Sequence, residues 1–309
     1  MAAPPTGPLP LMVLAVFVDG LGLGRPDTED NPVLDSKLEV LPWLLAGAVP
    51  LDATLKVPGL PQSATGQATL FTGVNAAAVA GRHVQGFPGP SLRRLLARGT
   101  FYSRVTSAGG KAAFLNTYSR AYLRMMAAGH MRASCSTLAA VSAGLPLRDA
   151  ASLRRGDGVH HDLTGDALCA QGEDVPRLDA RGAAETALRV AARHDLTVLE
   201  YFLTDQAGHS GDRGRARDVL RRLDAFLAAV LDGLGLGGGR QAAYAGGPPG
   251  VSPVRLVLFS DHGNIEDMSC DTHTLNPVPL VVWPPHEAAR SCTDLTGVAG
   301  LLEALAAPG

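Results

Sequence analysis

Two short segments of the 309-residue chain pair a carboxylate with an imidazole. Asp205 and His209 are four residues apart, so a single helical turn or tight loop can direct both side chains at one ion. Asp261 and His262 are adjacent and directly follow an apolar run; at a strand-to-loop turn they can converge on one cation. Taken alone, each pair is also compatible with a polar turn or loop.

Two further residues extend this set. Asp19 ends an apolar run and is followed by Gly20, and His273 lies shortly after the second pair. The six side chains comprise three carboxylates and three imidazoles, and acids left unpaired in a crevice would be costly unless divalent cations neutralised them. A mixed oxygen and nitrogen donor set without thiolates suits manganese or zinc. The sequence therefore predicts divalent metal binding.

A candidate nucleophile lies in the segment 57–75, where Pro and Gly residues precede a helix that is predicted to begin near Ser63. A hydroxyl at a helix N-terminus sits where backbone N–H groups favour a phosphoryl oxyanion. Two alternatives remain open at this point. Ser63 could serve only as the helix N-cap, and Thr65, Thr69 and Thr72 are rival hydroxyls.

Short apolar runs lead into each of the three aspartates. Continuous apolar runs of this length are typical of strands buried on both faces, and the stretches between them carry helical periodicity. Strands that alternate with helices predict a mostly parallel α/β sheet, whose ligands bind outside the carboxyl ends of the strands. The predicted strands are 11–18, 196–203, 254–259 and 279–283, and the clearest helices are 215–231 and 298–306.

The middle of the chain differs in composition from its two ends. Residues 86–181 mix helical stretches with Gly-rich polar pieces and contain no long buried strand. We therefore expect a metal-binding catalytic core formed by 1–85 and 182–309, with 86–181 as a small inserted cap subdomain. Residues 233–250 are rich in Gly, Pro and Ala and are expected to form a surface loop.

Composition excludes several classes of partner and location. A formal net charge of -2 gives no reason to expect nucleic acid or a membrane surface as a partner. The apolar run before Asp19 has no preceding Lys or Arg and no cleavage site, so we expect a buried strand and not a signal peptide. No segment has the roughly 20 apolar residues needed to cross a bilayer. The four cysteines lack CxxC spacing, which favours a reducing cytoplasm.

Several other polar residues could contact a substrate. Arg82 is the strongest of them, because a guanidinium binds phosphate in a bidentate way; Asn75 and Lys111 are further candidates. Each is individually more typical of a structural or surface role. The consecutive His160, His161 and Asp162 resemble a metal cluster, but side chains in a Gly-flanked turn rarely converge, so we expect them at the surface.

The motifs together resemble the cofactor-independent phosphoglycerate mutase and phosphopentomutase branch of the alkaline phosphatase superfamily. Asp19-Gly, Ser63-Ala-Thr-Gly-Gln, Asp205-x-x-x-His, Ser260-Asp-His-Gly-Asn and His273 occur in that branch's order. The resemblance implies an alkaline-phosphatase-like three-layer α/β/α sandwich with Ser63 as the nucleophile. It also implies two metal sites, one formed by Asp19, Ser63, Asp261 and His262 and the other by Asp205, His209 and His273.

The chain departs from that pattern in two places. Gly66-Gln67 stands where those mutases usually have Gly-His, and the insert is shorter than their cap domains. We therefore expect two-metal hydrolysis of a small phosphorylated metabolite through a phosphoserine. A phosphomutase is the alternative, and a non-catalytic metal-binding domain is the second. Sulfatases are excluded because Ser63 lacks their following Pro and Arg. The sequence does not indicate an oligomeric state.

Overall fold

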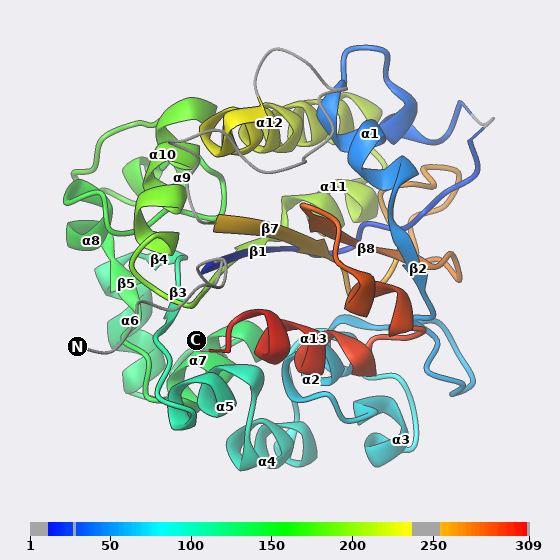
Figure 1. Ribbon diagram of the computed structural model, residues 1–309, viewed down its shortest axis with the longest axis horizontal. Helices are drawn as coiled ribbons and strands as arrows, with labels where there is room; N and C mark the ends of the chain where they lie inside the picture. Colours follow the sequence, from blue (N-terminus) through cyan, green and yellow to red (C-terminus); the bar gives the residue numbers. More distant parts are fainter. Residues whose placement is uncertain (1–11, 27–28, 237–253, 308–309) are drawn as a thin grey trace, which may run out of the picture.

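The computed structural model describes residues 12–26, 29–236 and 254–307, and a six-stranded sheet lies at its centre (Figure 1). The strand order is β2-β8-β7-β1-β6-β3. Strand β1 runs parallel to β6 and β7, β3 runs parallel to β6, and β8 is antiparallel to both β7 and β2. The strands are β1 (Met12–Val18), β2 (Val49–Leu51), β3 (Ala112–Phe114), β6 (Leu196–Tyr201), β7 (Val254–Phe259) and β8 (Val278–Trp283).

The apolar runs form strands because both faces of the sheet are covered. Alternate residues of β1 enter different cores: Phe17 packs in the cluster below the sheet in Figure 1, and Val16 and Val18 pack in the cluster above it. All three side chains are fully buried. A strand covered on both faces is apolar at every position instead of alternating with polar residues.

Helices cover both faces of the sheet, which confirms the predicted three-layer α/β/α architecture with a mostly parallel sheet (Figure 1). The upper layer holds α1 (Val40–Ala46), α10 (Ala180–Ala191), α11 (Leu203–Ser210) and α12 (Arg213–Leu231). The lower layer holds α2 (Ser63–Thr72), α3 (Ala76–Ala80), α4 (Pro90–Arg98), α5 (Phe101–Ser107), α7 (Cys135–Ser142) and α13 (Thr296–Leu305).

Helix α12 illustrates how the sequence sets a helix. Asp212 is its N-cap, and the carboxylate accepts hydrogen bonds from the backbone N–H groups of Gly214 and Arg215. Its buried positions recur at the spacing of one helix face, including Val219 and Leu223. That face packs against the sheet and α10.

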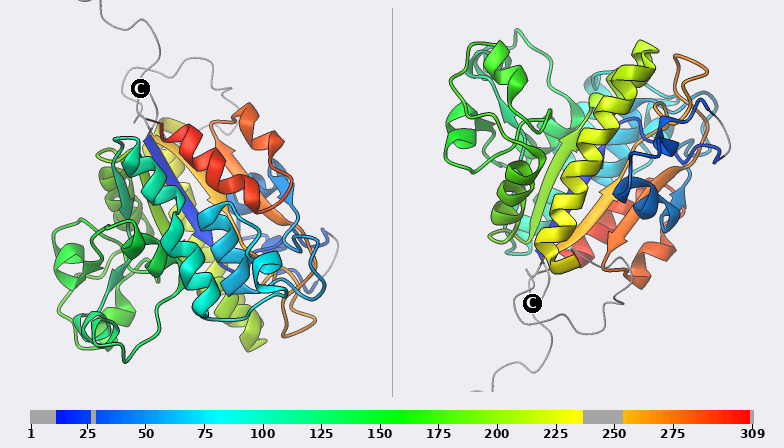
Figure 2. Two further views of the ribbon diagram at one scale, coloured as in Figure 1. Left: turned by 90° about the horizontal axis from the view of Figure 1, so that it is seen from below. Right: turned by 90° about the horizontal axis from the view of Figure 1, so that it is seen from above.

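A small group of elements lies beside the β3 edge of the sheet (Figure 2). It contains a two-stranded sheet and three short helices: β4 (Thr117–Tyr118), β5 (Arg148–Asp149), α6 (Arg120–Ala127), α8 (Ala150–Arg154) and α9 (Asp166–Ala170). The structure differs here from the predicted insert 86–181, because α4, α5, β3 and α7 from that range pack in the core or pair in the main sheet. A three-residue strand such as β3 is too short to show as an apolar run.

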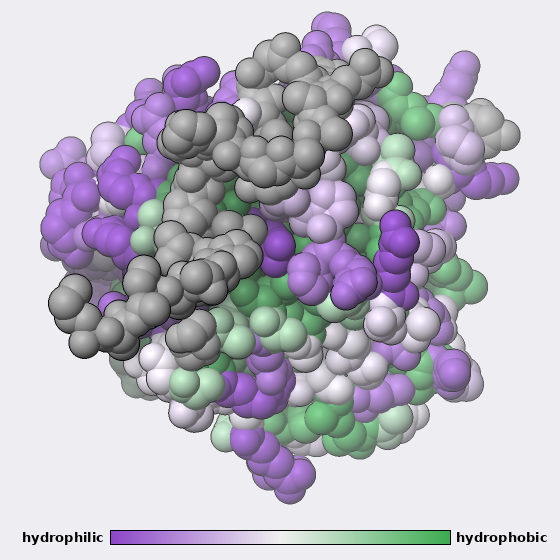
Figure 3. Space-filling view, in the orientation of Figure 1, coloured by the Kyte–Doolittle hydropathy of each residue, from purple (hydrophilic) through white to green (hydrophobic). Residues whose placement is uncertain are grey.

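The remaining elements are short turns of helix: η1 (Pro32–Leu34), η2 (Asp232–Leu236) and η3 (Glu287–Ser291). Most of the loop predicted at 233–250 lies outside the described residues. In the part of the chain that the structure describes, no helix is both long and apolar enough to cross a membrane. All four cysteines are free thiols, and the cytoplasmic location stays a prediction. Hydrophilic side chains gather over the α8 and α10 side of the molecule (Figure 3).

Candidate active site

The first cluster of acids and imidazoles forms where β1 and β7 end. These strands are parallel neighbours, so Asp19 after β1 and Asp261 and His262 after β7 emerge at the same edge of the sheet. His262 Nε2 lies 3.3 Å from Asp19 Oδ1 and 3.4 Å from Asp261 Oδ2. All three side chains are buried, and their donor atoms are close enough to share one ion. We refer to these residues as the first triad.

Ser63 joins the first triad from the opposite side. Its hydroxyl lies 3.0 Å from His262 Nε2. Gln62, and not Ser63, is the N-cap of α2, so the alternative in which Ser63 serves only as the cap does not hold. Ser63 is instead the first residue of the helix, and its side chain is free to face the triad.

The rival hydroxyls are all engaged with the backbone of α2 or the residue before it. Thr65 donates to the Gln62 carbonyl (3.1 Å), Thr69 to the Thr65 carbonyl (2.7 Å), and Thr72 to the Ala68 carbonyl (2.6 Å). All three are buried in the helix packing. Of the four hydroxyls considered, Ser63 is therefore the one placed for chemistry.

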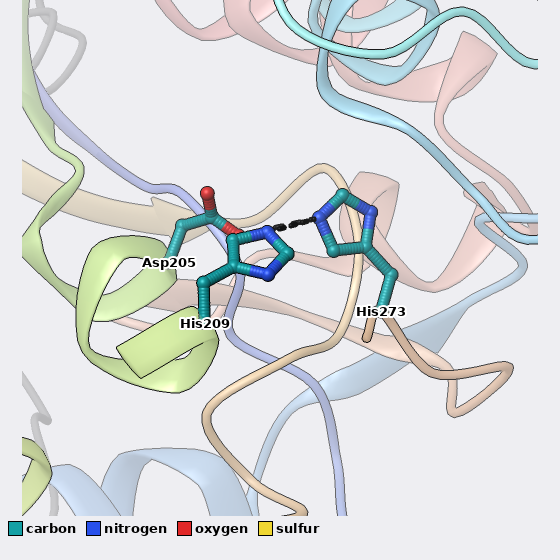
Figure 4. A group of neighbouring side chains, drawn as sticks. All are labelled: Asp205, His209 and His273. Atoms are coloured by element: carbon teal, nitrogen blue, oxygen red, sulfur yellow. Dashed lines mark hydrogen bonds and ion pairs between the residues drawn. The ribbon is translucent and has the colours of Figure 1, made fainter. Parts of the chain in front are cut away.

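The second cluster consists of Asp205, His209 and His273, which we call the second triad (Figure 4). Asp205 and His209 lie one turn apart on α11, and His273 comes from the loop between β7 and β8. Asp205 Oδ1 lies 3.4 Å from the Nε2 atom of each imidazole. The two Nε2 atoms are 3.0 Å apart.

The contacts of the two Nδ1 atoms determine which nitrogen of each imidazole carries the proton. His273 Nδ1 lies 2.7 Å from the Pro61 carbonyl and His209 Nδ1 lies 2.9 Å from the Asp271 carbonyl. A carbonyl can only accept, so each neutral ring carries its proton on Nδ1 and presents its Nε2 lone pair to the other ring. A cation between the rings would satisfy both lone pairs, so the donor set fits a divalent metal ion.

The two triads form one site. The rings of His262 and His273 stack with centroids 3.7 Å apart. Gly20, which follows Asp19, has φ +71, and a Cβ there would lie 2.9 Å from Asp205 atoms. The absence of a side chain at Gly20 thus allows the end of β1 to approach α11 closely.

Burial perturbs the acids of the first triad. Burial and the neighbouring Asp261 raise the pKa of Asp19 to about 7, and burial raises the pKa of Asp261 to about 6. Burial lowers the pKa of His262, but the Asp261 and Asp19 carboxylates outweigh it and raise the pKa to about 10. Asp19 Oδ1 and Asp261 Oδ2 accept no hydrogen bond. Buried carboxylate oxygens without donors fit a bound cation.

Other polar side chains hold the triad residues in place. Gln67, which stands where the mutases have His, donates to Asp19 Oδ2 at 3.0 Å. Asn264 donates to Asp205 Oδ1 at 2.7 Å. Burial opposes ionisation of Asp205, but the neighbouring His273 imidazole, the charge of His262 and the hydrogen bond from Asn264 lower its pKa to about 2. The buried Glu266 accepts from the backbone N–H groups at positions 22 and 264 and so ties the two loops together.

A cavity of about 440 Å³ opens beside Ser63. Its lining includes residues that the sequence analysis had set aside. His160 and Asp162 were expected at the surface, but both are buried, and His160 and His161 line this cavity. His160 Nδ1 lies 3.0 Å from Asp162 Oδ1. The prediction was wrong because α9 folds back over this turn, and its first N–H groups bind the Asp162 carboxylate.

Glu200 is a further cavity residue that the sequence analysis missed. It is the penultimate residue of the buried strand β6, and its carboxyl accepts a 2.6 Å hydrogen bond from Ser136. Burial raises its pKa to about 8. The signal was present in the sequence, since a lone acid in an apolar strand is unusual.

The three residues predicted to contact the substrate lie away from this cavity. Asn75 is the N-cap of α3, where its side chain accepts from Ala78 and donates to the Leu55 carbonyl. Lys111 immediately precedes β3 and so lies at the end of the sheet opposite to Ser63. Arg82 is exposed after α3 and does not appear among the described residues that line the cavity.

Comparison with known proteins gives three results. Residues 251–305 match the family model described as "Metalloenzyme superfamily". The 2,3-bisphosphoglycerate-independent phosphoglycerate mutase of Desulforudis audaxviator is 28% identical over 123 residues, covering 38% of this chain and 21% of that protein. The mutase of Haloarcula marismortui is 27% identical over 148 residues, covering 46% of this chain and 26% of that protein. The chain thus spans about a fifth to a quarter of the length of these relatives.

Solved structures share the fold. The PH0037 protein from Pyrococcus horikoshii superposes with a TM-score of 0.57 at 13% identity, covering 98% of both chains. The alkaline phosphatase from the Antarctic bacterium TAB5 superposes with a TM-score of 0.52 at 10% identity, covering 98% of this chain and 100% of that one. The chain therefore shares the fold of these proteins, and its residues 251–305 resemble the metalloenzyme superfamily. Over the matched parts of the chain, it resembles 2,3-bisphosphoglycerate-independent phosphoglycerate mutases.

Proposed function

We propose that the protein transfers a phosphoryl group through a phosphoserine formed at Ser63, with divalent metal ions as cofactors. The supporting observation is the position of the Ser63 hydroxyl, which borders the cavity on one side and lies 3.0 Å from His262 on the other. The substrate would be a small phosphorylated metabolite. The mixed carboxylate and imidazole donors favour manganese or zinc.

Each triad would hold one ion. Asp19, Asp261 and His262 would bind the first together with Ser63, and Asp205, His209 and His273 would bind the second. When bound, divalent ions lower the pKa of a coordinated hydroxyl and offset charge on the transferring phosphoryl group. Ser63 Oγ then forms a bond to phosphorus while the bond from phosphorus to the substrate's ester oxygen breaks.

The names of the relatives favour a phosphomutase over the hydrolysis that the sequence analysis expected. In a mutase, a second hydroxyl of the same substrate takes the phosphoryl group from Ser63. Because the matches cover about a fifth to a quarter of the length of those enzymes, mutase activity of this chain is a proposal.

One observation keeps hydrolysis as the second candidate. A mutase must retain the dephosphorylated intermediate while it reorients, which requires directional polar contacts. Among the described residues that line the cavity, Arg132 is the one Lys or Arg side chain, and it is exposed. Water would then be the acceptor.

A labelling experiment tests the proposal. The manganese-loaded protein is incubated with ³²P-labelled acetyl phosphate, and incorporated phosphate is mapped by peptide mass spectrometry. We expect label on Ser63, none in Ser63→Ala, and unchanged label in Thr65→Ser, which keeps a hydroxyl at the neighbouring position. Metal binding without label on any residue would instead support the non-catalytic metal-binding alternative.

The acceptor is tested separately with ribose 1-phosphate and 3-phosphoglycerate. Isomerised product without free phosphate supports the mutase, and free phosphate without isomer supports the hydrolase.

A further inference from the structure

Two stacked pairs of rings line the cavity beside Ser63. Tyr118 and Tyr122 stack with centroids 5.0 Å apart at an interplanar angle of 12°. His161 and Phe202 stack with centroids 4.1 Å apart at 28°. The first pair comes from β4 and α6, and the second joins the turn before α9 to the N-cap of α11. Independent parts of the chain therefore place flat ring systems around the same space.

The one histidine of these two ring pairs is uncharged. Burial and the neighbouring His160 lower the pKa of His161 to about 3, so the ring of His161 is neutral at physiological pH. It therefore offers a flat π surface and not a cation. The Tyr118 hydroxyl is occupied by a 2.7 Å hydrogen bond with Thr137, which leaves its ring as the contact surface.

The mouth of the cavity carries two large apolar side chains. Phe87 and Met131 line it with 48% and 40% of their surface exposed. Large apolar side chains exposed at the rim of a pocket mark a ligand site more often than they occur by chance on a surface. A thioether and a phenyl ring at this position favour an apolar, polarisable ligand.

The charges in the cavity disfavour a substrate that carries a second acid group. Asp19 and Asp205 are the lining acids that belong to the triads, burial holds the third lining acid, Glu200, in its protonated form, and Arg132 is the one Lys or Arg in the described lining. Metal ions at the triads would balance the phosphate but would leave a distant carboxylate of the substrate without a partner. A buried anion without a partner binds poorly.

We infer that the substrate is a phosphomonoester whose alcohol half carries a planar aromatic ring, held against the Tyr118–Tyr122 and His161–Phe202 pairs while the phosphate lies at Ser63. A nucleoside monophosphate and an arylalkyl phosphate share this chemistry. The cavity of about 440 Å³ is of the size that binds such small molecules. This inference rests on the proposed phosphoryl transfer with water as the acceptor, because an arylalkyl phosphate has no second hydroxyl that a mutase could use, and it adds the class of substrate.

A matched pair of inert ligands isolates the ring contact. Benzylphosphonate and cyclohexylmethylphosphonate differ only in aromaticity, and neither can lose its phosphoryl group. Their dissociation constants are measured by calorimetry on the manganese-loaded full chain. The saturated ring is the more hydrophobic of the two, so burial of area alone would favour cyclohexylmethylphosphonate. An aromatic ring stacked on the cavity rings, however, gains binding energy beyond the burial of its area. We therefore expect benzylphosphonate to bind about tenfold more tightly; equal binding, or tighter binding of the saturated ligand, overturns the inference.

Substitutions locate the contact. Phe202→Leu and Tyr122→Leu keep an apolar side chain but remove the ring, and each is expected to reduce the benzyl preference to about threefold or less. Met125→Leu is the matched control, since Met125 lies on the same helix as Tyr122, is 43% exposed and does not line the cavity. It should keep the full preference. A preference that survives in both ring variants would overturn the assignment of these walls.

Two further measurements complete the test. The affinities of adenosine 5′-monophosphate and benzyl phosphate show whether the ring belongs to a nucleoside or to an arylalkyl group. Tighter binding of either one than of ribose 5-phosphate supports the inference. Labelling of Ser63 by acetyl phosphate needs no ring, so it reports on the proposed function alone. Labelled Ser63 with no aromatic preference refutes the substrate class, whereas an aromatic preference without any label refutes the phosphoryl transfer.

Discussion

Glu200 is expected to make the metal-free protein less stable as the pH rises. Burial raises its pKa to about 8 from an ordinary value of 4.5, so between these values the folded state holds a proton that the unfolded state has released. The folded state then binds more protons than the unfolded state, and stability falls with increasing pH. The contribution is fully present below pH 4.5 and is lost as the pH passes through about 8.

The magnitude follows from the slope of this linkage. Between pH 4.5 and about 8, each pH unit lowers the free energy of unfolding by up to about 1.4 kcal/mol. Going from pH 5.5 to 7.5 should therefore lower it by about 2 to 3 kcal/mol. Glu200→Gln keeps the size of the side chain and an oxygen that can accept from Ser136. The difference in unfolding free energy between the variant and the parent protein should therefore grow in favour of the variant by about 2 to 3 kcal/mol from pH 5.5 to pH 7.5.

The assay is urea denaturation in EDTA at the two pH values. Taking the difference between variant and parent cancels other titrating groups that the substitution leaves unchanged. Glu185→Gln, at an exposed position of α10, is the matched control and should shift neither value. Parallel pH profiles for Glu200→Gln and the parent would refute the conclusion that this carboxyl is protonated in the folded protein.

Three further predictions concern the metals and the packing around them. Asp261→Asn and Asp205→Asn should each reduce manganese stoichiometry by about one ion per chain, as counted by elemental analysis; loss of both ions in either variant would show that the triads do not bind independently. EDTA should lower the melting temperature more at pH 8 than at pH 5.5. Burial raises the pKa of Asp261 to about 6, so at pH 5.5 this carboxyl is protonated and reduces the charge repulsion in the metal-free site. An equal effect of EDTA at both pH values would contradict this. Gly208→Ala should destabilise by about 1–3 kcal/mol, since its Cβ would lie 2.3 Å from the Asn264 amide, whereas Gly300→Ala in open space on α13 should stabilise by up to about 1 kcal/mol in the same denaturation assay.

The sheet was predictable where its strands are long enough to be covered on both faces. The run at 254–259 is observed as β7 with the same bounds, and the run at 11–18 is observed as β1 from residue 12. Short strands carried no such signal: β2 and β3 have three residues each, and neither forms an apolar run of its own. The predicted start of the insert at residue 86 therefore differs from the structure.

The metal-ligand candidates were predictable because neighbouring parallel strands end at the same edge of a sheet. Asp19 and Asp261, which follow two such strands, therefore had to lie close together. The cavity was not predictable in the same way. Its walls depend on how a turn such as His160-His161 folds back against Phe202, and no local spacing encodes that contact. Glu200 was the exception, since its charge stands out within an apolar strand.

The ligands of the two triads are drawn from both ends of the chain, from Asp19 to His273, and His273 is held by a carbonyl 212 residues earlier, at Pro61. No fragment that lacks either Asp19 or His273 can assemble the proposed two-metal centre. Loading with metal should therefore follow folding of the whole sheet and not precede it, and retained metal should slow unfolding of the native chain. Under this view, the amount of tightly bound manganese in a preparation measures the fraction of molecules that have completed their fold.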